Sequence, residues 1–242
     1  MIFDIIIPSF GCSPDITVKA IRCLETICEH SQDYRVLWID NGTPGAALAP
    51  VLAILDTMPH VLIRNRVNQG FVKATNQGLR FSTAPYVVLM NNDTEAAPNW
   101  LEKLREPFED TAARDAMGPV GMSGPLTTTP NSWQGRWPKT KKGWTHLAKG
   151  RMLAAFCLMM SRQCLEMVGF HDESFDQFGG FGGDDLLALT VERAGFELAL
   201  VQDLIIPHHH RSSFKALYSD ETIKEMQAEA LAMFHEKRKA TT

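Results

Sequence analysis

Two amides and one carboxylate, Asn91-Asn92-Asp93, directly follow the apolar stretch Tyr86–Met90. Oxygen ligands suit Mg²⁺ and Mn²⁺, which often take only one or two ligands from the protein and the rest from water and phosphate. The three residues therefore predict a place for a divalent ion at the end of a strand. The alternative is a turn in which Asn and Asp bond their own backbone.

A second acidic position, Asp184-Asp185, follows the glycine-rich stretch Gly179–Gly183. A carboxylate on a mobile loop can act as a general base that takes a proton from a substrate. Acidic residues in the first turn of a helix also stabilise the helix dipole. The residues alone leave both interpretations open.

Other polar clusters also stand where apolar runs end. Asp40-Asn41-Gly42 either forms a tight turn or presents a carboxylate that accepts from the N–H of a nucleotide base. The imidazoles of His208–His210 suit a metal ion or a phosphate, although three consecutive residues cannot all face one ion. Glycines in the segment Asn68–Gly78 allow the backbone to approach a ligand closely.

The elements that must position these clusters alternate between strand and helix. Apolar runs predict strands at 2–7, 34–39, 61–64, 86–90 and 197–201. Apolar periodicity predicts helices that begin at Ser13-Pro14 and that span 46–55, 71–81, the stretch up to Ala194, and 219–239. Strands separated by helices indicate right-handed crossovers and a mostly parallel sheet. We expect the strand ends, including Pro8-Ser9-Phe10, to meet where such sheets bind ligands.

Composition excludes several classes of protein. The 242 residues are 45% hydrophobic and 21% charged, with a net charge of −4, so neither a disordered chain nor a nucleic-acid partner is expected. No apolar run approaches the roughly 20 residues of a membrane helix. Met1–Phe10 contains Asp4 and does not resemble a signal peptide. Five cysteines without a Cys-x-x-Cys pair favour a reduced, cytoplasmic protein.

The order of the motifs resembles that of family 2 glycosyltransferases of the GT-A fold, in particular rhamnosyltransferase-like members. The resemblance covers roughly residues 2–214 and rests on many weak motifs in order. It is carried by Ile5–Phe10, Ile39–Gly42, Asn68–Gly78, Leu89–Thr94, Met152–Met160 followed by Gly169–Glu173, Asp184-Asp185 and His208–Ser213. It implies one α/β domain over 1–242 with a mostly parallel sheet flanked by helices. Its parts would be a nucleotide-sugar half (1–97), an acceptor half (98–214) and a C-terminal helix (215–242).

The resemblance also implies the chemistry: inverting transfer of a sugar from a nucleotide-diphospho-sugar to a hydroxyl of a glycan or glycoconjugate, with Mn²⁺ or Mg²⁺. Asp93 and His208 or a neighbour would hold the ion, and Asp184 or Asp185, with Asp184 favoured, would be the base. The nucleotide-sugar would contact Pro8, Phe10, Asp40, Asn68, Gly70 and Asn92. An acceptor attached to lipid would bring the protein to the inner face of the membrane.

The segment Met117–Cys164 contains seven Lys and Arg residues and no Asp or Glu. Trp133, Trp137 and Trp144 lie in it, and tryptophans among basic side chains favour a binding surface over a plain solvated loop. We predict that these three tryptophans stack on the sugars of the acceptor.

Two positions depart from the family pattern. Asn-Asn-Asp stands where the family often has two Asp residues, and Asp-Asp stands in place of Glu-Asp. Because one carboxylate is missing, a second hypothesis stays open: a domain that binds a nucleotide-sugar or glycan without catalysis. A metal-dependent hydrolase or nucleotidyltransferase would need more carboxylates around two metal ions.

Overall fold

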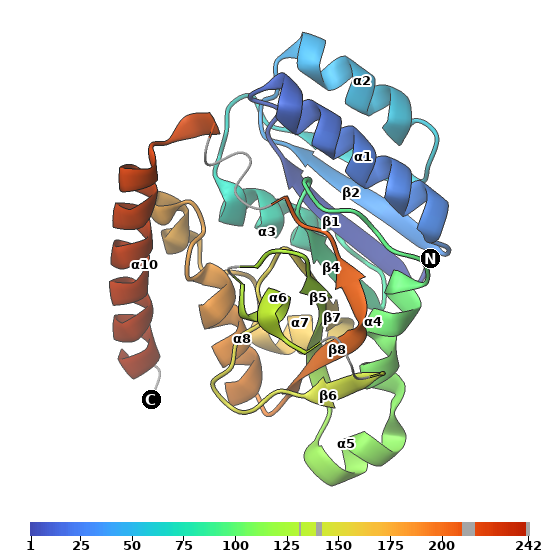
Figure 1. Ribbon diagram of the computed structural model, residues 1–242, viewed down its shortest axis with the longest axis vertical. Coiled ribbons are helices and arrows are strands. Elements are labelled where there is room, and N and C mark those ends of the chain that lie inside the picture. Colours follow the sequence, from blue (N-terminus) through green and yellow to red (C-terminus); the bar gives the residue numbers. More distant parts are fainter. Residues whose placement is uncertain (131, 139–141, 210–215, 241–242) are drawn as a thin grey trace.

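Eight strands form a single sheet with helices on both faces in the computed structural model, which describes residues 1–130, 132–138, 142–209 and 216–240 (Figure 1). The strands are β1 (Phe3–Ser9), β2 (Tyr34–Asp40), β3 (His60–Arg64), β4 (Tyr86–Met90), β5 (Val120–Thr127), β6 (Trp144–His146), β7 (Cys157–Ser161) and β8 (Glu197–Ile206). The helices are α1 (Pro14–His30), α2 (Gly45–Leu55), α3 (Phe71–Phe81), α4 (Trp100–Glu109), α5 (Thr111–Met117), α6 (Trp133–Arg136), α7 (Arg162–Val168), the 3-10 helix η1 (Glu173–Phe178), α8 (Gly183–Arg193) and α10 (Asp220–Ala240).

The strands lie in the order β3-β2-β1-β4-β7-β5-β8-β6. All of them run in one direction except β6 and β7, which pair antiparallel with their neighbours. The expectation of a mostly parallel sheet is therefore confirmed. The order of the strands reverses between β1 and β4, and the carboxyl ends of two such strands leave a crevice that can hold a ligand.

The local signals in the sequence position the first elements as expected. Every residue of β1 is buried, as its apolar run predicts. The Ser13 side chain accepts a hydrogen bond from the Ile16 N–H at 3.4 Å, and Pro14 stands at the first helical position of α1. In the second half, β8 continues five residues past the predicted end at Val201. This extension brings His208 to the same edge of the sheet as Asp93.

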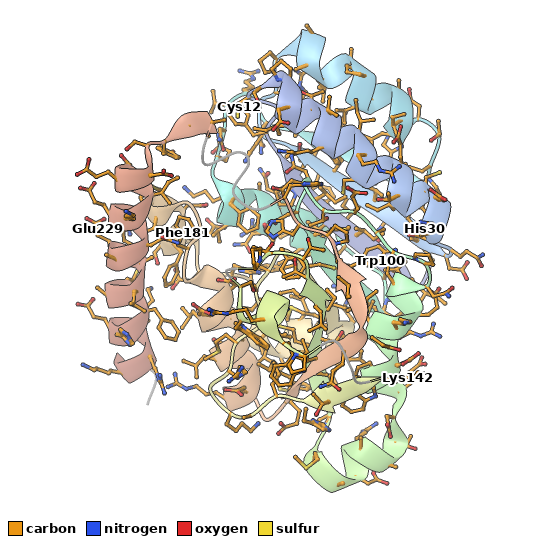
Figure 2. All side chains as sticks on the ribbon, viewed as in Figure 1. Cys12, His30, Trp100, Lys142, Phe181 and Glu229 are labelled. Atoms are coloured by element: carbon orange, nitrogen blue, oxygen red, sulfur yellow. The ribbon has the colours of Figure 1, made fainter. Side chains whose placement is uncertain are left out.

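Two hydrophobic clusters form the core, one on each face of the sheet. Helices α1, α2 and α4 pack on one face, where Trp100 is fully buried (Figure 2). Helices α3, α7 and α8 pack on the other face. Because both faces are covered, the strands are mostly apolar, and many of their polar groups lie at the strand ends.

The last helix, α10, lies along one side of the molecule against η1 and α8 (Figure 1). Ala230 and Phe234 of α10 join a third cluster, which also contains Phe175 of η1 and Leu189 of α8. Glu229 lies on the opposite side of this helix and is exposed (Figure 2). Across the part of the chain that the structure describes, no helix is long and apolar enough to cross a membrane.

Candidate active site

A cavity of about 430 Å³ lies at the carboxyl edge of the sheet. Its walls come from the ends of β1, β4, β5 and β8, the start of α3, the segment before β7, the loop before α8, and the chain next to α10. Eight of the residues that the sequence singled out line it: Pro8, Phe10, Asn68, Gly70, Asn92, Asp93, Asp184 and His208. Segments that lie far apart in the chain therefore converge on one site.

The crevice between β1 and β4 forms the floor of the cavity. Asn92 donates from Nδ2 to Ser9 Oγ at 3.0 Å and so ties the two strand ends together. Pro8 and Phe10 line the cavity on either side of Ser9. The sequence analysis placed Ser9 at this edge within the cluster Pro8-Ser9-Phe10, but its hydrogen bond with Asn92 could not be predicted.

The loop before α3 is held by several side chains. Gly70 N–H donates to Asn68 Oδ1 at 2.9 Å, and Asn41 Nδ2 donates to the Gly70 carbonyl at 2.9 Å. Gly70 has a φ of +96°, and a Cβ there would lie 2.4 Å from Asp176 Oδ1. Only glycine fits this position, which brings the backbone to the wall of the cavity.

Asp176 of η1 supplies the missing cap of α3. Its carboxylate accepts from the N–H groups of Val72 at 2.7 Å and Lys73 at 2.9 Å. Burial raises the pKa of Asp176 above its ordinary value, against the opposing effect of these two hydrogen bonds. This role could not be predicted from the sequence, because Asp176 lies about a hundred residues from the helix that it caps.

Asp40 does not line the cavity, contrary to our expectation that it faces a nucleotide base. It is fully buried and accepts from Arg64 Nε at 3.1 Å and from the Thr43 N–H at 3.1 Å. Its neighbour Asn41 lines the cavity instead. Asp40 thus supports the loop after β2 from beneath, as the turn interpretation of Asp40-Asn41-Gly42 implies.

Asp93 and His208 meet at the ends of β4 and β8. His208 Nε2 lies 3.2 Å from Asp93 Oδ1 and 3.3 Å from Asn91 Nδ2. The imidazole stacks on the ring of Phe156, with 5.1 Å between the ring centroids and 12° between the planes. This stacking holds the plane of the imidazole ring. His210 lies outside the described residues, as do 211–213 of the late His-to-Ser element.

Asp184 and Asp185 take different positions at the start of α8. Asp184 lines the cavity and accepts from the Ala155 N–H at 3.1 Å, whereas Asp185 is not part of the lining. Burial raises the pKa of Asp184 above its ordinary value, and hydrogen bonds from Ala155 and Asp185 oppose this effect. Burial, followed by the charge of Asp184, raises the pKa of Asp185 to about 7.

The three tryptophans do not line the cavity. Trp133 and Trp137 pack edge to face with ring centroids 5.9 Å apart, and the guanidinium of Arg151 lies over both rings. Trp144 lies on β6 beside β8, where it packs against the core cluster that contains α1 and α4. All three are half-buried, so packing accounts for much of the apolar character of this segment.

Several residues that line the cavity were not among the predicted site residues. His171 lines the cavity, as do Phe181 of the loop before α8 and Leu217, Tyr218 and Gln227 near and on α10. Figure 2 shows Phe181 on this loop, beside α10. Within the described ranges, no group of three or more His, Cys, Asp or Glu residues could hold a metal ion.

Comparisons with known proteins agree with this architecture. A family model described as glycosyl transferase family 2 matches residues 4–168. A protein of Mycobacterium tuberculosis (strain CDC 1551 / Oshkosh) that is described among glycosyltransferases is 34% identical over 87 residues. That match covers 36% of this chain and 25% of the relative, so the chain spans about a quarter of the relative's length.

Two solved structures share the fold. A mannosyltransferase from Pyrobaculum calidifontis in complex with GDP-Man and Mn²⁺ superposes with a TM-score of 0.65 at 15% identity, over 97% of this chain and 70% of that one. TarS residues 1–349 of S. aureus superpose with a TM-score of 0.63 at 12% identity, over 96% and 71% of the two chains.

Proposed function

The chain belongs to glycosyl transferase family 2, and we propose that it transfers a hexosyl or rhamnosyl unit from a nucleotide-diphospho-sugar to an acceptor hydroxyl with inversion. The observation that carries the proposal is the shared cavity of Asp93 and Asp184. Asp93 is suited to the diphosphate side of a donor, and Asp184 is suited to the acceptor side. The cavity between them is large enough for a sugar nucleotide to enter.

The nucleotide is proposed to bind over the crevice between β1 and β4. Pro8 and Phe10 offer apolar surface to the base, while Asn68, Gly70 and Asn92 offer backbone and amide groups to the base and ribose. Asp40 does not contact the nucleotide in this proposal; it holds in place the loop that carries Asn41.

The residues at the ends of β4 and β8 fit a divalent ion. A nucleotide-bound Mg²⁺ or Mn²⁺ needs only one or two protein ligands, and Asp93 with His208 offers one carboxylate and one imidazole. Asn91, whose Nδ2 lies 3.3 Å from His208 Nε2, lines the same part of the cavity. Such an ion supplies charge neutralisation to the departing nucleoside diphosphate.

Asp184 is proposed as the general base. The acceptor oxygen forms a bond to the anomeric carbon while the bond from that carbon to the diphosphate oxygen breaks. The proton of the acceptor hydroxyl passes to the Asp184 carboxylate, and the nucleoside diphosphate leaves with the electron pair. A raised pKa makes this carboxylate a stronger proton acceptor at neutral pH.

Trp133 and Trp137 are proposed to contact the outer part of a long acceptor. Ser132 lines the cavity and directly precedes Trp133, so a glycan that leaves the cavity there passes the Arg151–tryptophan cluster. Trp144 lies on the far strand β6 and is proposed to contact only sugars further out.

The proposal is tested by donor binding and by turnover. Sugar nucleotides are screened with Mn²⁺ by isothermal calorimetry, starting with GDP-mannose, the ligand of the Pyrobaculum structure. Release of nucleoside diphosphate is then measured with candidate acceptors. Asp93→Ala is expected to lose metal-dependent turnover and to keep the melting temperature within a few degrees, because Asp93 lies at the surface of the cavity.

Glu95→Ala, two residues away on the exposed side of the same loop, is the matched control and should retain turnover. If Asp93→Ala turned over in EDTA at the rate of the unaltered protein, the assignment of Asp93 as a metal ligand would be contradicted. Binding of sugar nucleotides without release of nucleoside diphosphate under any acceptor would favour a non-catalytic binding domain.

A further inference from the structure

A short segment before β7, Ala154–Phe156, connects the two sides of the site. All three of its residues line the cavity. The Ala155 N–H donates to Asp184 Oδ2 at 3.1 Å, and the ring of Phe156 stacks on the imidazole of His208. The orientation of the Asp184 carboxylate therefore depends on where the backbone of this segment lies.

The two ends of the segment are held by different parts of the molecule. At the end next to β7, the Phe156 carbonyl accepts from the Asn91 N–H at 2.9 Å, and Cys157 then pairs with Met90 of β4. Ala154 and Ala155 precede the strand, so the pairing of β7 with β4 does not reach them. Another element must hold the part of the segment that contacts Asp184.

The side chain of Gln134, on the short helix α6, holds that part. Its Oε1 accepts from the Ala154 N–H at 2.9 Å, and its Nε2 donates to the carbonyl of Pro125 in β5 at 2.7 Å. Gln134 is fully buried and does not line the cavity. One amide thus connects the backbone beside Asp184 to the sheet.

Helix α6 is itself packed tightly, which makes it a firm support. A Cβ at Gly135 would overlap the carbonyl of Thr129, so the helix lies directly on the chain that follows β5. Trp133 Nε1 donates to the Met152 carbonyl at 3.0 Å, two residues before Ala154. A buried amide is costly unless it is fully hydrogen-bonded, and both polar atoms of the Gln134 amide have partners here.

We propose that Gln134 is a positioning residue for the transfer reaction: by holding the Ala154 N–H, it keeps the Ala155 N–H against Asp184 and so orients this carboxylate toward the acceptor hydroxyl. The inference rests on the proposed function, in which Asp184 is the base, and deepens it. Because Phe156 is held from β4, the donor side should not depend on Gln134.

The first measurement separates catalysis from donor binding. Gln134→Met keeps a side chain of similar length and removes both hydrogen bonds. It should lower kcat about tenfold, the effect of a slightly misplaced base, with the Kd of the sugar nucleotide unchanged by calorimetry. Gln134→Glu should recover part of kcat, because a buried carboxyl takes up a proton and then offers the same acceptor and donor. Equal losses of kcat and donor affinity in Gln134→Met would overturn the inference.

The second measurement is a double-mutant cycle with Asp184→Asn. If Gln134 acts through the Asp184 carboxylate, Gln134→Met should leave the residual kcat of Asp184→Asn nearly unchanged. A structural role would instead lower kcat by the same factor in both backgrounds, and that result would also overturn the inference. Release of nucleoside diphosphate in single turnovers measures the low rates.

Ser123→Ala is the matched control. Ser123 is also fully buried, and its Oγ donates to the Leu104 carbonyl at 2.7 Å, away from the cavity lining. This variant should lower the melting temperature and leave kcat unchanged. If Gln134→Met does not fold, Gln134→Asn, whose amide is too short to reach both partners, takes its place in both measurements.

The outcomes also distinguish this inference from the proposed function. An unchanged kcat in folded Gln134→Met, together with a large loss in Asp184→Asn, would overturn the role of Gln134 and leave the base assigned. An unchanged kcat in Asp184→Asn would overturn the assignment of the base. Failure of the unaltered protein to release nucleoside diphosphate with any acceptor would overturn glycosyl transfer itself.

Discussion

Asp184 and Asp185 are adjacent at the start of α8, but only Asp184 lines the cavity. Asp184 is oriented by the Ala155 N–H, which belongs to the segment that leads into β7. Asp185 contributes a charge beside it, and that charge opposes ionisation of the pair. The two aspartates therefore differ in position and in pKa because their surroundings differ.

The first prediction separates the two carboxylates by activity. Asp184→Asn should lower kcat about 10²–10⁴-fold, the usual contribution of a general base, with donor affinity unchanged. Asp185→Asn should retain turnover within about tenfold at alkaline pH, because it removes no group from the cavity. Kinetics at pH 8 with calorimetry of donor binding provides the measurement. Equal losses of kcat in the two variants would contradict the assignment of Asp184 as the base.

The second prediction concerns stability and pH. The pKa of Asp185 is about 7 in the folded protein, against roughly 3.9 in an unfolded chain, so the folded state holds the proton more tightly. The stability that this proton contributes is present below about pH 4 and is lost as pH rises through about 7. Asp185→Asn removes the titration. Its melting temperature should therefore exceed that of the unaltered protein at pH 8 by more than at pH 4, as differential scanning calorimetry would show.

Residue types alone could not predict the roles of the side chains that act through distant partners. Asp40 was expected in the site because it ends a strand, but Arg64 on the neighbouring strand takes its carboxylate. Asp176 could not be selected, because its role depends on the first turn of α3. Several of the selected side chains that do line the cavity, such as Pro8, Asn92 and Asp93, lie at strand ends, which were themselves sufficient to position them there.

The elements were more predictable than the individual contacts. Strand β4 and helix α3 have the expected bounds, since a continuous apolar run and a helical period are local signals. The end of β8 was missed because its second half contains the polar residues Gln202 and Asp203, which interrupt the apolar run. The packing of Trp133 and Trp137 against each other and under Arg151 could not be predicted, because it is not encoded locally, and their contact with an acceptor stays a prediction.

The third prediction concerns the contact between η1 and α3. Asp176→Ala removes the only side-chain cap of α3 among the described residues and should lower the free energy of unfolding by about 1–2 kcal/mol. It should also weaken donor binding, because Asp176 packs against Gly70 in the cavity wall. Asp176→Asn keeps one acceptor oxygen and should lose less. Urea unfolding and calorimetry measure the two effects.

Asp110→Ala is the matched control for this capping role. Asp110 caps α5 by accepting from the Ala113 N–H at 2.9 Å, far from the cavity lining. This variant should lose stability of a similar order with no change in donor affinity. An equal effect of both variants on donor affinity would show that general destabilisation, and not the loop at Gly70, is responsible.

At the scale of the whole molecule, the residues of the site gather at the carboxyl edge of the sheet, and α10 completes the wall of the cavity. The crevice between β1 and β4 receives groups from β5, β8 and the segment before β7, so the two halves of the chain share the cavity. The chain then returns along α10, which packs on η1 and α8. Leu217, Tyr218 and Gln227 reach the cavity from this last part of the chain.

The fourth prediction tests whether α10 holds that wall in place. Phe234 is 7% exposed in the cluster with Phe175 and Leu189, so Phe234→Ala should lower the free energy of unfolding by about 3 kcal/mol. The same change should raise acceptor KM, because the residues that α10 brings to the cavity lose their support. Leu231→Ala lies on the outer side of the helix, where the side chain is 54% exposed, and should shift the free energy by less than about 0.5 kcal/mol. Urea unfolding with acceptor kinetics compares them, and a stability loss in Phe234→Ala with unchanged KM would show that α10 stabilises the fold without shaping the acceptor side.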